Sequence, residues 1–344
     1  MSIWDQPLPA KILLVGKSGA GKTGSLASLI AAGYNLRIID TDKGFRPLRS
    51  LLTDKIHYPY GKIIAEDGID VTQAVRCVPV DLTMRIKDIT TKVGNMNKIE
   101  KVLGPKSADG FNKIIDLISD WKEPDGCKLG PVDTWGPKDV LVLDSFSTLA
   151  KMSYYYSQAL NGRLGARDEG YNYQRDIGAA QSQLTRLLEM LYDSNIKCNV
   201  IVITHITWVD ESKGYAANPK PNANDTDKRD TGEIINEPDG LPSAIGRALS
   251  PQIGKYFNDQ FVVRSIGYGA NVKHKISTVP QDGVSAKNSV YLEKEYDVKT
   301  GLAEIFAALR EDPLPKNFLS RFDQKPTSST PSKPQLTIGL AAQK

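Results

Sequence analysis

The fold is decided by residues 11–23, which read KILLVGKSGAGKT. The opening KILLV is a short, continuous apolar run of the kind found in a strand buried on both faces. The remainder matches the pattern G-x-x-x-x-G-K-[ST], which binds phosphate where it follows a strand and begins a helix. A helix is predicted from Lys22 to Ala32, because Gly33 supplies a stop signal. The sequence therefore predicts a strand, a phosphate-binding loop (P-loop) and a helix, in that order.

Each residue type in the P-loop has a physical role. Glycines let the backbone curl so that successive N–H groups point at phosphate oxygens, and the helix N-terminus adds the positive end of its dipole. We expect Lys22 to reach the β- and γ-phosphates and the Thr23 hydroxyl to bind Mg²⁺. A glycine-rich turn without a ligand is the alternative. The predicted nucleotide contacts are Gly16, Lys17, Ser18, Gly19, Ala20, Gly21, Lys22, Thr23 and Ser25.

Further apolar runs predict the rest of a sheet. They lie at 36–40, 140–143, 199–203 and 260–264. A helix is predicted over about 171–193, where apolar residues follow the 3.6-residue period. Strands that alternate with helices indicate an α/β fold with a mostly parallel sheet and right-handed crossovers.

Polar residues end three of these runs. Asp144 follows four apolar residues, which is the Walker B pattern of an acid that holds Mg²⁺. Carboxyl ends of parallel strands share one edge of a sheet, so these residues should lie near the P-loop. We predict that Asp42 activates water as a general base and that Asp40 caps or orients its turn. A plain Asp-Gly turn is the alternative. His205 is predicted to sense the γ-phosphate, and a purely structural histidine is the alternative.

The predicted core is residues 1–315. It contains a poorly patterned insertion at 84–137 and a polar segment at 206–242, which is expected to be a mobile loop. Residues 316–344 are rich in Lys, Pro, Ser and Thr and are predicted to be a flexible tail. The tail is either a frayed end or a tethered peptide that binds a protein partner.

Composition excludes several classes of protein. Hydrophobic residues make up 40% of the chain, yet no stretch reaches the ~18–20 apolar residues of a membrane span, so no membrane is expected. The N-terminus lacks the pattern of a signal peptide, and three widely spaced cysteines indicate reduced thiols, so a cytoplasmic location is expected. The net charge of +4 is too small to indicate nucleic-acid binding by itself.

Together these motifs resemble the RecA-like P-loop ATPases. More narrowly, the chain resembles a phage-encoded nucleotide-binding family in that class, which includes RecA-like single-strand annealing ATPases; the location would then be the host cytoplasm. The resemblance spans roughly residues 9–310 and is carried by 16–23, 39–44, 143–147, 203–205, 253–262 and 276–287. It implies the sheet order 5-1-4-3-2, with the strand of His205 between those of the P-loop and Asp144. Asp42 stands where a catalytic Glu is usual and reaches less far.

The resemblance also implies cofactors and partners. ATP and Mg²⁺ would bind between the subunits of a ring or filament, where a neighbour supplies a cation to the γ-phosphate. Candidates for that cation are Lys273, Lys275 and Lys287, of which Lys287 matches the family's late lysine. The catalytic set is then Lys22, Asp42, Asp144, His205 and Lys287.

Single-stranded DNA is the implied substrate. In this class, loops after the third and fourth strands face a central channel, where aromatic rings stack on bases and arginines pair with phosphates. The matching residues are Tyr154, Tyr155, Tyr156, Arg163, Arg167 and Trp208. Packing between helices is the alternative for the tyrosines.

The expected function is a DNA-dependent ATPase in recombination, annealing or replication. Two alternatives remain open. Lys17 stands where the deviant Walker A motif of ParA/MinD-like switch ATPases has its signature lysine. A binding module that nucleotide orders without hydrolysis would use the same P-loop.

Overall fold

The computed structural model describes residues 8–48, 75–82, 108–124, 126–164, 170–209, 239–246 and 248–314. An eight-stranded sheet, in the order β12-β11-β10-β1-β7-β6-β2-β3, forms its centre. The strands are β1 Lys11–Gly16, β2 Asn35–Asp40, β3 Val75–Pro79, β6 Asp139–Asp144, β7 Asn199–Thr204, β10 Asp259–Ile266, β11 Lys273–Ser277 and β12 Glu295–Asp297.

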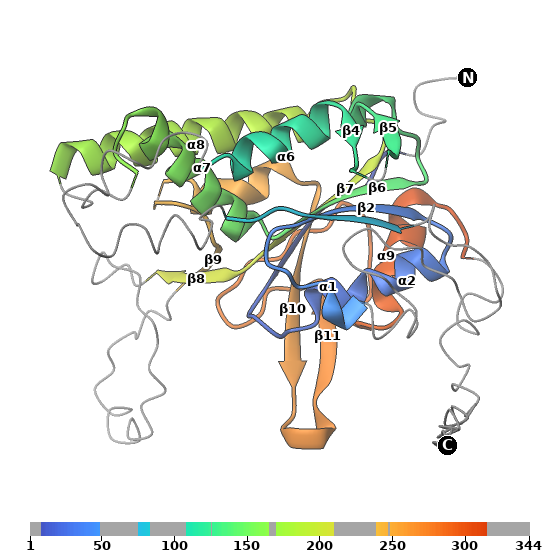
Figure 1. Ribbon diagram of the computed structural model, residues 1–344. Helices are drawn as coiled ribbons and strands as arrows, with labels where there is room; N and C mark the ends of the chain where they lie inside the picture. The colour runs from blue at the N-terminus through green and yellow to red at the C-terminus, as the bar shows by residue number, and fades with distance from the viewer. Residues whose placement is uncertain are drawn as a thin grey trace, which may run out of the picture.

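The sheet is parallel from β10 to β3, and β11 and β12 extend it antiparallel to β10. The five predicted strands are β1, β2, β6, β7 and β10, and their order confirms the expected 5-1-4-3-2. The strand that leads to His205, β7, lies between β1 and β6, as the resemblance implies. The β10–β11 hairpin projects away from the body of the sheet (Figure 1).

Helices cover both faces of the sheet (Figure 1). On one side lie α1 Lys22–Ser25, α2 Ala27–Ala31 and α9 Gly301–Arg310, and on the other α6 Gly110–Ser119, α7 Phe146–Leu160 and α8 Gly170–Tyr192. Alternate residues of β1 enter the two apolar layers: Ile12 and Leu14 face the first, and Leu13 and Val15 face the second. This two-sided burial explains why the run KILLV has no polar face.

Most predicted elements are confirmed, with corrected bounds. The helix predicted over 22–32 is divided into α1 and α2 at Leu26, and the helix predicted over 171–193 is α8. Within the insertion at 84–137 the structure describes α6, β4 Trp121–Lys122, β5 Lys128–Gly130 and a 3-10 turn, η3 Val132–Thr134. Two further 3-10 turns are η5 Ser250–Tyr256 and η6 Gly269–Asn271.

The prediction of a loop over 206–242 is wrong at both ends of that range. There β8 Ile206–Val209 pairs antiparallel with β9 Asp239–Pro242, and Ile206 and Trp208 of β8 pack on the second layer. Residues 210–238 and the predicted tail at 316–344 lie outside the described residues. Within the described ranges, no helix combines the length and apolar character that crossing a bilayer requires.

The P-loop follows β1 where two strands come very close. A Cβ atom added to Gly16 would lie 2.3 Å from the Val263 carbonyl oxygen of β10, so only glycine fits there. Gly19 and Gly21 have φ angles of +76° and +99°, a conformation that side chains disfavour. These glycines let the chain turn from β1 into α1 at the carboxyl edge of the sheet.

Candidate functional site

A cavity of about 1100 Å³ opens at the carboxyl edge of the parallel strands, beside the P-loop. Four of the five predicted catalytic residues line it: Lys22, Asp42, Asp144 and His205. They come from α1 and from the ends of β2, β6 and β7, which the sheet order places side by side. The prediction that these polar residues meet at one edge is therefore confirmed.

Lys22 is held on the backbone of its own loop. Its Nζ donates to the carbonyl oxygens of Gly16 (2.7 Å) and Lys17 (2.8 Å). Burial lowers the pKa of Lys22 to about 8, although the carboxylates of Asp144 and Asp42 favour its charged form. A phosphate would offer this buried ammonium a stronger, charged partner than the two carbonyls.

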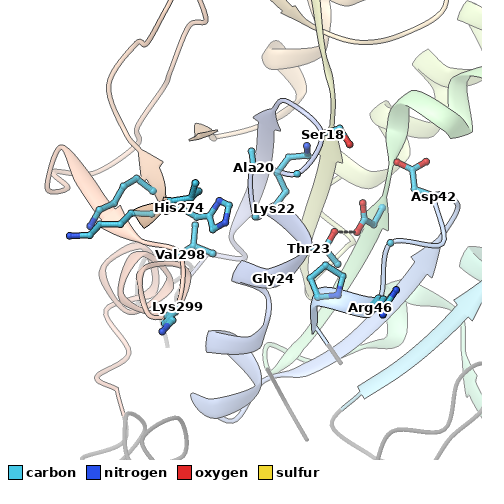
Figure 2. A pocket seen from close by; sticks show the side chains of 18 of the residues that line it. Ser18, Ala20, Lys22, Thr23, Gly24, Asp42, Arg46, His274, Val298 and Lys299 are labelled. Atoms are coloured by element: carbon cyan, nitrogen blue, oxygen red, sulfur yellow. Dashed lines mark hydrogen bonds between the residues drawn. The ribbon is translucent and has the colours of Figure 1, made fainter. Parts of the chain in front are cut away.

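Thr23 and Asp144 meet where Mg²⁺ is expected. The Thr23 hydroxyl donates to Oδ2 of Asp144 over 2.6 Å (Figure 2). Burial raises the pKa of Asp144 to about 6; Asp40 and Asp42 add to the rise, while the Thr23 hydrogen bond and Lys22 oppose it. A hydroxyl and a buried carboxylate are hard oxygen ligands, so these residues fit a Mg²⁺ ion, whose charge would relieve the burial of Asp144.

Asp42 is held by two polar side chains. Its Oδ2 lies 3.0 Å from Nε2 of His205, and its Oδ1 accepts a hydrogen bond from the Thr148 hydroxyl of α7. Burial opposes the ionisation of Asp42, but hydrogen bonds from His205, Thr148 and Ser145 outweigh it and lower its pKa to about 2. Asp42 is therefore ionised at neutral pH.

The neighbouring Asp40 has the structural role predicted for it. It is buried, and its Oδ1 accepts the backbone N–H of Gly44 over 3.1 Å. Between the two acids, the Thr41 hydroxyl accepts the N–H of Ser145 (2.9 Å) and donates to its carbonyl oxygen (3.0 Å). The turn that carries Asp42 is thus fixed to the end of β6.

The other predicted P-loop contacts divide into two groups. Ser18, Gly19, Ala20, Gly21 and Thr23 line the cavity. Ser25 is fully buried, and its hydroxyl donates to the Lys22 carbonyl oxygen, so this side chain faces its own helix. The Lys17 ammonium is directed to β8, where it lies 5.6 Å from the centre of the Trp208 ring.

Two predicted DNA contacts face other parts of the protein instead. Tyr154 is 5% exposed, and its hydroxyl accepts a hydrogen bond from the Gln158 amide. Arg163 forms an ion pair with Asp176 of α8. Both side chains contact α8, as expected for packing between helices, and their contact with DNA stays a prediction. Tyr155 and Tyr156 are half-buried against apolar clusters, and Arg167 lies outside the described residues.

The three lysines proposed for a neighbouring site differ in position. Lys287 is exposed, and its Nζ donates to the Phe257 carbonyl oxygen over 2.8 Å, away from the cavity. Lys273 and Lys275 instead line the cavity of their own chain. Lys287 is therefore the one of the three that does not line the cavity of its own chain, and its approach to a neighbour stays a prediction.

Sequence reasoning missed one wall of the cavity. His274 of β11, together with Val298 and Lys299, lies on the far side of the P-loop from Asp42 and Arg46 (Figure 2). The sequence signal was absent because the wall depends on antiparallel pairing of β11 with β10, more than 200 residues after the P-loop.

The chain was compared with known proteins. A family model described as "AAA domain" matches residues 8–225. No curated protein sequence matches the chain.

Two similar solved structures come from archaea. The flagellar accessory protein FlaH of Methanocaldococcus jannaschii is 10% identical, covers 84% of each chain and has a TM-score of 0.32. The KaiC-like protein PH0186 of Pyrococcus horikoshii OT3 is 11% identical, covers 85% of this chain and 86% of its own, and has a TM-score of 0.33. These TM-scores are too low for either structure to inform function.

The family model covers the residues that form the candidate site. The matched residues include the P-loop, Asp42, Asp144 and His205. The match extends over more than half of the chain. The chain therefore belongs to the AAA domain family, a family of P-loop ATPases, and its P-loop lines the cavity.

Proposed function

We propose that this protein binds and hydrolyses Mg-ATP and that it acts on single-stranded DNA. One observation carries the ATPase proposal: the P-loop lysine, the Thr23–Asp144 pair and the Asp42–His205 pair line a single cavity. They supply a phosphate cradle, oxygen ligands for a cation and a carboxylate for water. Phosphoryl transfer depends mainly on such positioning and charge.

The residues divide the chemistry among them. Lys22 and the loop N–H groups hold the phosphates, and Thr23 and Asp144 hold Mg²⁺, which neutralises charge on the phosphates when bound. Asp42 orients the attacking water. Its pKa of about 2 keeps it ionised at neutral pH, so it can accept a hydrogen bond from the water.

The coupling to DNA is proposed to run through His205. This residue follows β7 and precedes β8; its N–H donates to the Ser147 hydroxyl (2.9 Å) and its carbonyl accepts from the N–H of Ser243 (2.8 Å). A change at Asp42 would therefore reach the β8–β9 pair. The segment between these strands is the proposed DNA contact, with Trp208 at its base and the cations Lys213, Lys220, Lys228 and Arg229 in its sequence.

The remaining parts of the proposal follow the resemblance. The protein would act in recombination, annealing or replication as a ring or filament of identical chains, in the cytoplasm of a phage host. Lys287 of one copy would approach the γ-phosphate of the next. Residues 316–344 would bind a protein partner.

The test of this function is ATP hydrolysis with and without single-stranded DNA. We expect single-stranded DNA to raise the rate, because the segment proposed to bind it follows β8, which is joined to the γ-phosphate site through His205. Hydrolysis that ignores DNA would contradict the DNA proposal and favour a ParA/MinD-like switch. ATP binding without any hydrolysis would favour a nucleotide-ordered binding module.

Asp42→Asn is expected to lower kcat about 10²-fold, the lower end of what a general base contributes. The amide keeps the size of the side chain but loses the charge that orients water, so ATP affinity should remain. Rapid-quench hydrolysis and equilibrium ATP titration measure the two effects separately. Asp116→Asn, on the exposed side of α6, is the matched control. An unchanged kcat in Asp42→Asn would remove Asp42 from the mechanism.

A further inference from the structure

The nucleotide cavity has two chemically different ends. Asp42 and Arg46 lie at one end, and His274, Val298 and Lys299 lie at the other, with the P-loop and Lys22 between them (Figure 2). The first end carries Asp42 and the predicted water site. The second end has no role in the chemistry described above.

The acidic end fixes the direction of a bound nucleotide. Thr23 and Asp144 would hold a cation that neutralises charge on the phosphates, and Asp42, the residue proposed to orient the attacking water, lines the same part of the cavity. The γ-phosphate must then lie toward Asp42. Because a nucleoside triphosphate is an extended molecule, its nucleoside must lie across the P-loop, at the end formed by His274 and Val298.

His274 is held directly against the phosphate-binding turn. A Cβ atom added to Gly21 would lie 3.1 Å from Cβ and 3.2 Å from Cγ of His274. The ring is oriented by a hydrogen bond of 3.0 Å between its Nδ1 and the Ser265 hydroxyl of the paired strand β10. The His274 carbonyl oxygen accepts the N–H of Val298 over 3.2 Å, which fixes the adjoining wall.

The surroundings of this ring suit a flat aromatic ligand. His274 is half-buried, so part of its side chain remains accessible in the cavity. Val298, 6% exposed, adds an apolar surface, and it too would touch a Cβ atom at Gly21, at 3.4 Å. A positioned aromatic ring beside an apolar side chain is the combination on which bases stack.

We propose that His274 is the residue on which the nucleotide base stacks, so that this wall makes the site prefer nucleotides to inorganic polyphosphate. The assignment rests on the proposed nucleotide function and deepens it. His274 is a specificity residue for the same site, contributed by the β10–β11 hairpin rather than by the P-loop or its neighbouring acids.

The test compares two ligands that share phosphates and differ in the nucleoside. Full-length wild-type protein, His274→Ala and His274→Phe are titrated calorimetrically with ATP and with inorganic tripolyphosphate, both with Mg²⁺. In His274→Ala we expect the Kd for ATP to rise about tenfold, in the range measured for loss of one stacked base. The Kd for tripolyphosphate should stay unchanged. His274→Phe keeps an aromatic face and should recover most of the ATP affinity.

The outcomes separate this proposal from the proposed function. If His274→Ala loses affinity for ATP and for tripolyphosphate equally, the ring only supports the P-loop. If the affinity for ATP is unchanged, the ring does not contact the nucleotide. Either result overturns the assignment. Wild-type protein that binds ATP no better than tripolyphosphate would overturn it while leaving the phosphate site intact. Wild-type protein that binds neither ligand would overturn the proposed function as well. Lys113→Ala, on α6, is the control variant.

Discussion

Lys22→Ala is expected to reduce ATP hydrolysis by about 10²–10³-fold, the effect of removing one preorganised donor from a site where charge develops. Lys22 is 6% exposed. Within the described P-loop, its ammonium is the only charged donor that lines the cavity. Alanine cannot replace that charge, so both ATP binding and the transition state lose a partner. Steady-state hydrolysis and ATP titration measure the two losses.

The same change should not unfold the protein. Burial lowers the pKa of Lys22 from 10.5 to about 8. Keeping this buried group charged at neutral pH therefore lowers the free energy of unfolding of the nucleotide-free protein. The Lys22→Ala protein should therefore unfold at the same urea concentration as the wild type or at a higher one. Lys113→Ala, an exposed position on α6, controls for loss of a surface lysine. A Lys22→Ala protein that is folded and fully active would refute the site.

Asp144→Asn is expected to have two opposite effects. Hydrolysis that depends on Mg²⁺ should fall by about 10²-fold or more, because the amide gives the cation a weaker ligand than the carboxylate. The free protein should become more stable at pH 8. Asparagine keeps an oxygen that can accept the Thr23 hydroxyl, and it removes the buried charge.

The raised pKa of Asp144 determines how the stability of the wild type changes with pH. Burial raises the pKa of Asp144 from 3.8 to about 6, so between these values the folded protein binds more protons than the unfolded chain. The free energy of unfolding of the wild type therefore falls as pH rises from about 4 to 6, by about 1–3 kcal/mol. Asp144→Asn should lack this fall.

Urea unfolding at pH 5 and pH 8, in the presence of a chelator, measures the difference. The stability gained by Asp144→Asn should be larger at pH 8 than at pH 5, with Asp116→Asn as the control at both values. An Asp144→Asn protein that is less stable than the wild type at pH 8 would show that the carboxylate stabilises the fold without a cation.

Local patterns were sufficient to predict which polar residues meet at the Asp42 end of the cavity. The P-loop depends on glycines at fixed spacing, and Asp42, Asp144 and His205 each follow an apolar strand directly, so chain order places them at one edge. The strand order itself came from the resemblance. Periodicity and composition alone do not show which strands of a parallel sheet lie next to each other.

The opposite end of the cavity could not be predicted in this way. His274 reaches the P-loop only because β11 pairs with β10, and short strands such as β11 and β12 have little periodicity of their own. The burial of Tyr154 has a local explanation. Its neighbours at helical spacing, Ala150 and Ser157, are small and buried, which is typical of a face that packs on another helix.

The two edges of the large sheet bear on how copies of this chain can meet. In the part of the chain that the structure describes, β12 and β3 are the edge strands. β12 has three residues, including the exposed acids Glu295 and Asp297, and β3 carries Arg76 and ends at Pro79, which has no N–H to donate. Short, charged or proline-ended edges discourage strand-to-strand joining, the usual route to amyloid-like aggregation. The two described edges of the large sheet therefore disfavour an assembly in which this sheet continues from copy to copy.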